Sequence, residues 1–406
     1  MATYFVAPDG SDGNAGTKAD PLGSIEAAAD SVGPGDTIYL RGGTYDRSSN
    51  VSLNGSDGTE SDPIVLAGYR DERPVIRFDG PDSGGWSAYD AGGVSLNVAH
   101  WEIRNLTVEN SPYMGIVADG SSNHHNTFAD LEVRNCYLVG FALYNGAHDN
   151  LVTNVTAHGN VGNAGDADGI QFSDTARNTL RNSVSYGNSD DGVDLWESVD
   201  CRIENCASFG NGLNGGNGNG FKLGGSNGSA TSGGHVVQHC RAYDNSYNGF
   251  NHNGANKTIE VFNCTSYDNG GQGYVAWDNG SDATHVYRNC IAYQNANGAV
   301  DTGSEDEETR NTWTLGIGDP QFRSTDPDAD GFLRPATDSP VVDAGTDVGL
   351  DYAGEAPDLG AFEARSDSTG PSGPVVRHHD GSGWRDATLK YHDGSGFVEA
   401  QVNRLG

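Results

Sequence analysis

The chain has 406 residues, including 59 glycines and only two methionines, and its 23 basic residues face 56 acidic ones, for a formal net charge of −33. Such a charge argues against nucleic acid and anionic membranes as partners. No apolar run approaches the ~18 residues that a membrane-spanning helix requires. The acidity predicts a high-salt habitat, since about 1 M salt shortens the Debye length to about 3 Å. An ordinary acidic protein is the alternative.

Abundant glycine and short apolar windows rich in Val, Ile, Phe and Tyr predict an all-β chain with many turns. Residues 1–34 are expected to form an N-terminal cap and first strand, with a short capping helix that begins at Ser24. The opening letters MATYFVAPDG contain no basic segment and no apolar stretch, so no secretory signal is visible.

Asparagine recurs about every 25 residues, after a short apolar alternation, in segments such as NSVSYGN, NCASFGN and NCTSYDN. The recurring residues are Asn110, Asn135, Asn160, Asn188, Asn211, Asn245, Asn269 and Asn295. This period predicts the coil of a parallel β-helix, whose stacked coils bury one continuous core. We expect the solenoid to span residues 35–320, with these amides hydrogen-bonded from coil to coil. A leucine-rich-repeat solenoid is disfavoured, because no L-x-x-L-x-L pattern occurs.

Four cysteines occupy the same position of four successive repeats, the first of the two small or apolar positions that alternate toward the interior. They are Cys206, Cys240, Cys264 and Cys290. We interpret them as buried small hydrophobic residues rather than as disulfides or metal ligands.

A glycine marks a second strand in each coil, as in GIQF, GVDL, GFKL and GFNH. Asp168 and Asp191 precede this glycine in neighbouring coils, so they are expected about 4.8 Å apart. Asp194 and Lys222 share an outward column on the same strands, and Asp190 lies at the adjoining turn. Four carboxylates and one lysine are therefore predicted to converge on one exposed face.

Four converging carboxylates repel one another unless a cation neutralises them. Ca²⁺ suits such a cluster, because it accepts oxygen ligands at about 2.3–2.6 Å in flexible geometry. The alternative is a solvated acidic turn in a chain that is rich in them.

The segments DADG (166–169), NSDDGVDL (188–195) and GNGFKLGG (218–225) resemble, in order and spacing, the signature of polysaccharide lyase family 9, the pectate lyases with a right-handed parallel β-helix. The resemblance covers about residues 95–300. It implies a calcium ion held by Asp168, Asp190, Asp191 and Asp194, with Lys222 as the catalytic base. The implied reaction is β-elimination from a uronic-acid glycan, in which calcium acidifies the C5 proton and a neutral lysine removes it.

Three further polar residues are candidate substrate-binding groups: Arg241, Asn251 and Gln171. Arg241 is expected to point outward one coil beyond Lys222. Because other basic residues are sparse between 161 and 300, the substrate is either pectate or another acidic polysaccharide.

Residues 321–364 are predicted to cap the solenoid, and 365–374 (RSDSTGPSGP) to form a flexible linker. Residues 375–406 are interpreted as two short β-hairpin-like units, around HHDGSGW and YHDGSGF, that resemble repeats of viral tail fibres. With no signal peptide visible, this tail favours a virion tail spike that acts on a host surface glycan, either as a homotrimer or attached to other tail proteins through 365–406. The virus is expected to infect a haloarchaeon. The alternatives are a glycan-binding fibre without activity and a secreted, extracellular pectate lyase of a haloarchaeon.

Overall fold

The computed structural model describes residues 1–79, 93–162, 165–227, 230–276 and 283–364, and the backbone of four short strands between 377 and 399. The chain divides into two compact units, Met1–Ala364 and Arg365–Gly406, which we treat separately. Among the described residues, no helix has the length and apolar composition needed to cross a membrane.

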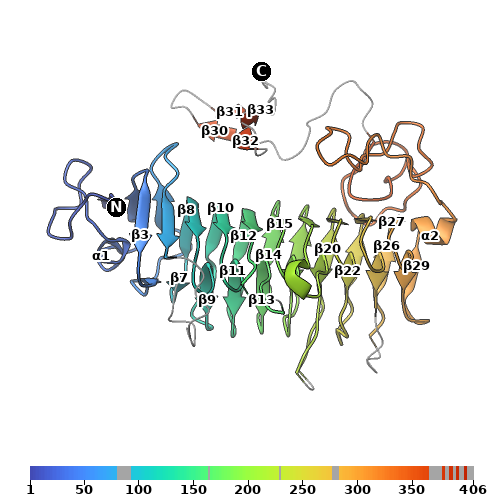
Figure 1. The fold of residues 1–406 in the computed structure, drawn as a ribbon, viewed down its shortest axis with the longest axis horizontal. Coiled ribbons are helices and arrows are strands. Elements are labelled where there is room, and N and C mark those ends of the chain that lie inside the picture. Colours follow the sequence, from blue (N-terminus) through green and yellow to red (C-terminus); the bar gives the residue numbers. More distant parts are fainter. Residues whose placement is uncertain are drawn as a thin grey trace. The chain divides into compact units, whose positions relative to one another are not determined.

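The first unit is a parallel β-helix, as predicted, in which each coil adds one strand to a ten-stranded sheet and one long strand or two short ones to a 19-stranded sheet (Figure 1). One sheet has ten strands stacked in strict chain order. They are β4 (Val51–Leu53), β7 (Val94–Leu96), β9 (Ile116–Asp119), β11 (Phe141–Tyr144), β13 (Ile170–Ser173), β16 (Val193–Asp194), β19 (Phe221–Lys222), β22 (Phe250–Asn251), β25 (Tyr274–Val275) and β28 (Val300–Asp301).

The other sheet has 19 strands, also paired in parallel from coil to coil. They are β1 (Thr3–Val6), β2 (Thr37–Leu40), β3 (Thr44–Arg47), β5 (Ile64–Gly68), β6 (Val75–Phe78), β8 (Trp101–Glu109), β10 (Thr127–Arg134), β12 (Leu151–His158), β14 (Thr179–Arg181), β15 (Val184–Tyr186), β17 (Arg202–Glu204), β18 (Ala207–Phe209), β20 (Val236–Gln238), β21 (Arg241–Tyr243), β23 (Glu260–Phe262), β24 (Thr265–Tyr267), β26 (Val286–Arg288), β27 (Ile291–Tyr293) and β29 (Glu307–Thr309).

Helices are few and short in the described chain: α1 (Ile25–Ala29), α2 (Thr312–Leu315) and the 3₁₀ turn η1 (Leu213–Gly215). The predicted capping helix is confirmed in α1, where the Ser24 side chain accepts a hydrogen bond from the backbone N–H of Ala27. This is the usual N-cap interaction, which satisfies one of the free N–H groups at a helix start.

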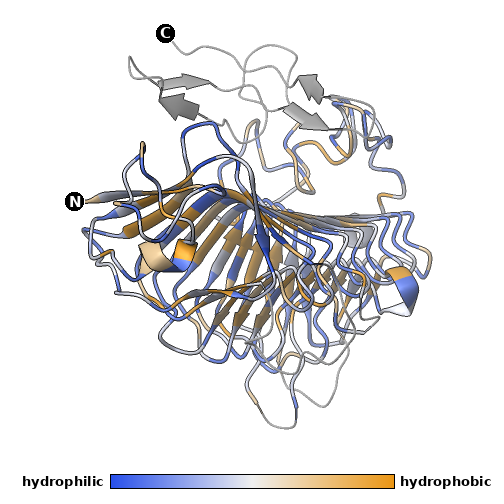
Figure 2. Ribbon diagram, turned by 60° about the vertical axis from the view of Figure 1, so that its left-hand side comes forward, coloured by the Kyte–Doolittle hydropathy of each residue, from blue (hydrophilic) through white to orange (hydrophobic). Residues whose placement is uncertain are grey.

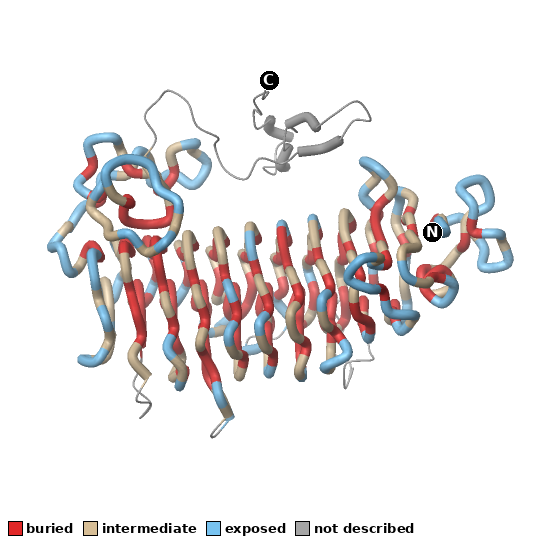
Figure 3. The backbone as a smooth tube through the Cα atoms, turned by 180° about the vertical axis from the view of Figure 1, so that it is seen from behind, coloured by how far each residue is buried: buried red, intermediate tan, exposed pale blue. Residues whose placement is uncertain are grey.

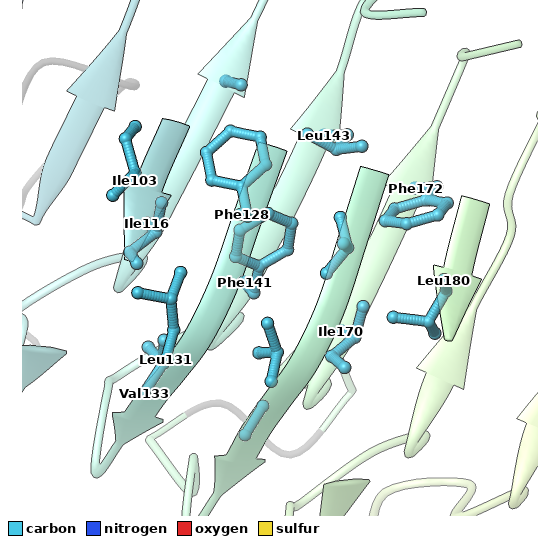
Figure 4. Packing of buried hydrophobic residues seen from close by; sticks show 14 of the residues in the cluster. Ile103, Ile116, Phe128, Leu131, Val133, Phe141, Leu143, Ile170, Phe172 and Leu180 are labelled. Carbon is cyan, nitrogen blue, oxygen red and sulfur yellow. The ribbon is translucent and has the colours of Figure 1, made fainter. Parts of the chain in front are cut away.

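One hydrophobic core runs through the coils, because alternate strand residues point into the lumen (Figures 2 and 3). In the middle coils Phe128, Phe141 and Phe172 pack beside Ile and Leu side chains from both sheets (Figure 4). The four aligned cysteines are buried in this core and unpaired. Their interpretation as small hydrophobic residues is therefore confirmed.

An asparagine ladder fixes one corner of the coils, but it is shorter than predicted. The amide of each member donates to the side-chain oxygen of the next at 2.9 Å; the members are Asn160, Asn188, Asn211, Asn245, Asn269 and Asn295. Asn110 and Asn135 are not members, because both adopt left-handed backbone (φ 60° and 55°) one residue before the ladder position. Cys136 takes that position in the coil of Asn135, and its backbone N–H donates a hydrogen bond to Asn160 Oδ1.

The predicted register holds through the middle coils and slips by one residue in the last. Strand pairing aligns Ile170 with Val193 and then Val193 with Phe221. In the final coil Tyr274 pairs with Val300, which lies two residues after Gly298 and not one, so Asp301 follows Val275 in the outward column.

The second unit contains two antiparallel pairs, β30 (Arg377–His379) with β31 (Trp384–Asp386) and β32 (Lys390–His392) with β33 (Phe397–Glu399). The predicted linker 365–374 lies outside the described residues.

Candidate active site

The outward column of the ten-stranded sheet carries four polar residues in register. Gln171 of β13 pairs with Asp194 of β16, Asp194 with Lys222 of β19, and Lys222 with Asn251 of β22. These four residues therefore lie side by side on neighbouring coils, about one strand spacing apart.

A glycine before each of these strands lets the coils approach closely. A Cβ atom on Gly169 would lie 1.8 Å from Ser185 Oγ, and one on Gly192 would lie 1.8 Å from Ser208 Oγ. No side chain fits there, so the coil turns inward at glycine, and the preceding residues, Asp168 and Asp191, are brought into one stack.

Asp168, Asp191 and Asp194 form a buried carboxylate triad, in which one oxygen from each lies within 4.8 Å of the others. Asp168 Oδ1 accepts a hydrogen bond from the Asp191 N–H at 2.8 Å. Asp191 Oδ1 accepts from the backbone N–H and the side-chain amide of Asn219, both at 2.7 Å. These contacts orient the carboxylates before any cation binds.

Asp190 lies beside the triad but is not part of it. Its side chain is buried, and Oδ1 accepts a hydrogen bond from the Asn217 N–H at 2.7 Å. The sequence predicts that Asp190 is a fourth cation ligand. Its carboxylate is not among the three that converge, so this role stays a prediction.

Lys222 is the counter-ion of the triad. Its Nζ lies 3.2 Å from Asp191 Oδ2 and 3.1 Å from Asp194 Oδ2, and 5.3 Å from the ring centroid of Trp196. Its side chain is only 14% exposed, so it is more enclosed than an outward-facing residue was expected to be. Trp196 was not among the predicted site residues. Its position two residues after Asp194 is the sequence feature that could have indicated it.

The neighbouring amides extend this network. Gln171 Nε2 donates to Asp194 Oδ2 at 3.2 Å, and Gln171 Oε1 accepts from the Tyr144 hydroxyl. Asn251 Nδ2 donates to Asn219 Oδ1 at 3.3 Å. Gln171 and Asn251 thus border the triad on either side, as the column predicted.

Burial and mutual repulsion dominate the electrostatics of the cluster. Burial, followed by the charges of Asp194 and Asp191, raises the pKa of Asp168 well above its usual range. Burial raises the pKa of Asp194 to about 6, against the opposing effect of Lys222. For Lys222, burial disfavours the ammonium, but the surrounding carboxylates outweigh it and raise the pKa. The lysine is therefore protonated in the calcium-free protein.

Arg241 lies one coil beyond Lys222, as predicted, but in the other sheet, so its role in substrate binding stays a prediction. It belongs to β21 in the 19-stranded sheet, where it pairs with Ala207 and Thr265. Its guanidinium lies 4.7 Å from the ring centroid of Phe362 in the C-terminal cap. The strands that a coil contributes to the two sheets face different directions, and the repeat pattern alone does not show which side chains share one face.

The triad fits a hard divalent cation. Asp194 Oδ1 is buried without a hydrogen-bond partner, and Asp191 Oδ2 has an ion pair with Lys222 but no hydrogen bond. Two oxygens on opposite sides of Ca²⁺ lie up to about 5.2 Å apart, so a spread of 4.8 Å matches its coordination sphere. The donors are oxygens only, which suits calcium better than zinc.

Comparison with known proteins identifies the family. The family model of the Pel9A-like right-handed β-helix region matches residues 4–279. This chain belongs to that family, polysaccharide lyase family 9.

Relatives of the family are similar over most of the chain. Pectate lyase PEL9 of Emericella nidulans is 34% identical over 355 residues, which is 77% of this chain and 83% of that protein. Pectate lyase L of Dickeya chrysanthemi is 32% identical over 395 residues, covering 89% and 90%. The crystal structure of pectate lyase Pel9A superposes with a TM-score of 0.77 at 29% identity, covering 90% of this chain and 97% of that one.

These similarities confirm the predicted family and handedness. They give no support to a virion tail spike or to a high-salt habitat, because the relatives above are pectate lyases of a fungus and a bacterium. The secreted-enzyme alternative agrees with them better.

Proposed function

We propose that this protein is an extracellular, calcium-dependent pectate lyase that cleaves polygalacturonate by β-elimination. The observation that carries the proposal is the contact of Lys222 Nζ with Asp191 and Asp194, in a buried triad that keeps unpartnered oxygens. A hydrolase with paired carboxylates would leave this lysine without a role. The names of the relatives point to the same substrate class.

Each residue has a distinct task in this proposal. Asp168, Asp191 and Asp194 hold the cation, with Asp190 beside them. Calcium bound there supplies positive charge that binds the uronate carboxylate, acidifies the C5 proton and lowers the pKa of the neighbouring ammonium. Lys222 Nζ, once neutral, accepts the C5 proton.

The proposed reaction is an elimination, and no water is added across the broken bond. The electron pair of the broken C5–H bond forms the C4–C5 double bond, the C4–O bond breaks, and solvent protonates the leaving oxygen. Gln171 and Asn251 present amides on either side of Asp194 and Lys222, where they can donate to or accept from substrate hydroxyls.

The test is direct. Polygalacturonate should yield an unsaturated, ultraviolet-absorbing product with calcium and none with a chelator, whereas a neutral glycan should yield none. The non-catalytic glycan-binding alternative is correct if the protein binds polyuronate but cleaves none at any calcium concentration.

A further inference from the structure

A second group of metal-binding side chains lies at another corner of the coils. It comprises His100, His124 and His125, and the ring of His148 stacks on that of His124. His124 and His148 are paired across adjacent coils by a parallel bridge. His100 and His125 both adopt left-handed backbone, with φ of 56° and 55°. Histidine, like asparagine and aspartate, is enriched in such backbone, and the pairing of the coils places His100 and His125 at equivalent positions.

The imidazole nitrogens converge. One ring nitrogen each from His100, His124 and His125 lies within 4.8 Å of the others. The Nδ1 atoms of His124 and His125 are 3.0 Å apart. His100 stacks on His125 with ring centroids 5.1 Å apart, so the three rings come from two successive coils and face one point.

A fourth ring and a carboxylate support the group. His148 stacks on His124 with centroids 5.2 Å apart, and its Nδ1 lies 2.8 Å from Asp149 Oδ2. Arg177 holds Asp149 through two hydrogen bonds, of 2.9 and 2.7 Å. Asp149 and Arg177 thus fix the ring of His148, which packs against His124.

The histidine group is distinct from the carboxylate triad. Asp168 and Asp191 precede strands β13 and β16 and Asp194 lies in β16, whereas His124 and His125 follow β9 and precede β10. The two groups therefore lie at opposite ends of the strands of the ten-stranded sheet, and on different coils.

We propose that His100, His124 and His125 form a binding site for a borderline d-block cation such as Zn²⁺, with a fourth coordination position open to water. Imidazole nitrogen is a preferred ligand of Zn²⁺, Ni²⁺ and Cu²⁺ and a poor one for calcium. Zinc binds nitrogen at about 2.0–2.1 Å, which places tetrahedral ligand atoms about 3.3 Å apart, so nitrogens within 4.8 Å of one another must approach by up to about 1.5 Å. The ion would join two coils and thus stabilise the solenoid.

The protonation state agrees with this geometry. Burial, together with His125, His148 and His100, lowers the pKa of His124. A lowered pKa favours the neutral imidazole, the form that binds a metal ion.

The experiment measures zinc affinity of the full, untagged chain by competition with a chromophoric chelator, in excess calcium so that the carboxylate triad is occupied. His125→Asn is the first variant, because asparagine tolerates the left-handed backbone at this exposed position. Since loss of a supporting group alone costs about 10–100-fold in affinity, loss of this ligand should cost at least about tenfold. Zinc should raise the unfolding midpoint of the parent.

Two controls separate this site from other histidines. His158→Asn, whose ring stacks on Tyr186 of the other sheet, should bind zinc like the parent. The triple variant of His100, His124 and His125 to asparagine should lose both zinc binding and the rise in midpoint. The proposal is overturned if the parent binds no zinc, if the triple variant binds as tightly as the parent, or if His158→Asn loses as much affinity as His125→Asn.

Discussion

At the scale of single residues, Lys222 needs opposite protonation states in the calcium-free protein and in the proposed reaction. In the calcium-free protein its ammonium balances a buried triad, and in the proposed reaction it must give up that proton. In the proposed mechanism, calcium held by the carboxylates would replace the ammonium as their counter-charge. Lys222 would therefore stay protonated until the cation binds.

We predict that Lys222→Ala and Lys222→Arg both lose about 10²–10⁴-fold in turnover at saturating calcium, the range ascribed to a general base. Arginine fails because guanidinium stays protonated. Steady-state kinetics on polygalacturonate measure the loss. Lys257→Ala is the matched control, since Lys257 pairs with Asp200 away from the triad. Wild-type turnover in either Lys222 variant would exclude this lysine as the base.

The stability of the Lys222 variants depends on calcium. Lys222 is enclosed and ion-paired with buried carboxylates. Lys222→Ala therefore leaves their negative charge unbalanced and should lower the stability of the calcium-free protein. The kinetic comparison should therefore be made with calcium present, where the cation replaces the missing charge.

A pH prediction follows from the raised carboxyl pKa values. Burial raises the pKa of Asp190 and of Asp194 to about 6, above the ~3.9 of an unfolded chain. The folded protein thus binds more protons, and without calcium its free energy of unfolding should fall as pH rises from about 4 to about 6. Urea unfolding in chelator checks this.

The control isolates the site from other groups. Asp194→Asn should flatten the pH dependence, and Asp200→Asn, at an exposed corner, should leave it unchanged. With calcium bound the trend should reverse, because protons compete with the cation. An Asp194→Asn profile identical to that of the parent would refute the assignment.

At the scale of the elements, the glycine that starts each strand sets the spacing of the site. A Cβ atom added to Gly192 would meet Ser208 Oγ, Asn211 Nδ2 and the carbonyl oxygen of Gly220, the last at 2.9 Å. A methyl group there must displace both the ladder and the next coil. The site and the asparagine ladder are therefore coupled through one small residue.

We expect Gly192→Ala to destabilise the protein by about 1–3 kcal/mol, the cost of overpacking a close-packed interior, and to weaken calcium binding. Thermal unfolding and calcium titration measure both effects. Gly33→Ala is the control, because its added methyl group meets no atom within 4 Å. Equal stability of the two variants would contradict the coupling.

The sequence was informative wherever side chains repeat with the coil. The alignment of Asp168 with Asp191 and of Asp194 with Lys222 could be found from the period alone, because parallel coils place equivalent residues above one another. Asn110 and Asn135 were misassigned, since asparagine is favoured both in left-handed turns and in ladders, and the residue type does not distinguish the two.

Arg241 could not be placed correctly for a different reason. The sequence placed Arg241 in the correct coil, one beyond Lys222. The direction of its side chain depends on the sheet that its strand joins and on Phe362 of the cap, which lies far along the chain. Contacts between a coil and a distant cap leave no periodic signal.

At the scale of the whole molecule, the net charge of −33 works against both compactness and the approach of a polyanion. Both repulsions weaken as salt shortens the Debye length from about 30 Å at 0.01 M to about 10 Å at 0.1 M. Bulk charge thus bears on substrate capture as well as on stability.

We predict that kcat/KM on polygalacturonate rises as sodium chloride increases from about 0.01 to about 0.1 M at saturating calcium, through a lower KM. Initial rates over this range measure the effect. A short, singly charged uronide substrate serves as the comparison and should respond less. A KM that is constant or increases with salt would contradict electrostatic exclusion of the polymer.

The assembly of the site from β13, β16 and β19 also bears on how such a protein can change over generations. Duplication or loss of one complete coil toward either end keeps every remaining coil in contact with an equivalent neighbour, so it alters length without breaking the fold. The same event between Asp168 and Lys222 removes a ligand or separates the base from the carboxylates. Within this family, variation in coil number is therefore expected to accumulate outside the segment from Asp168 to Asn251.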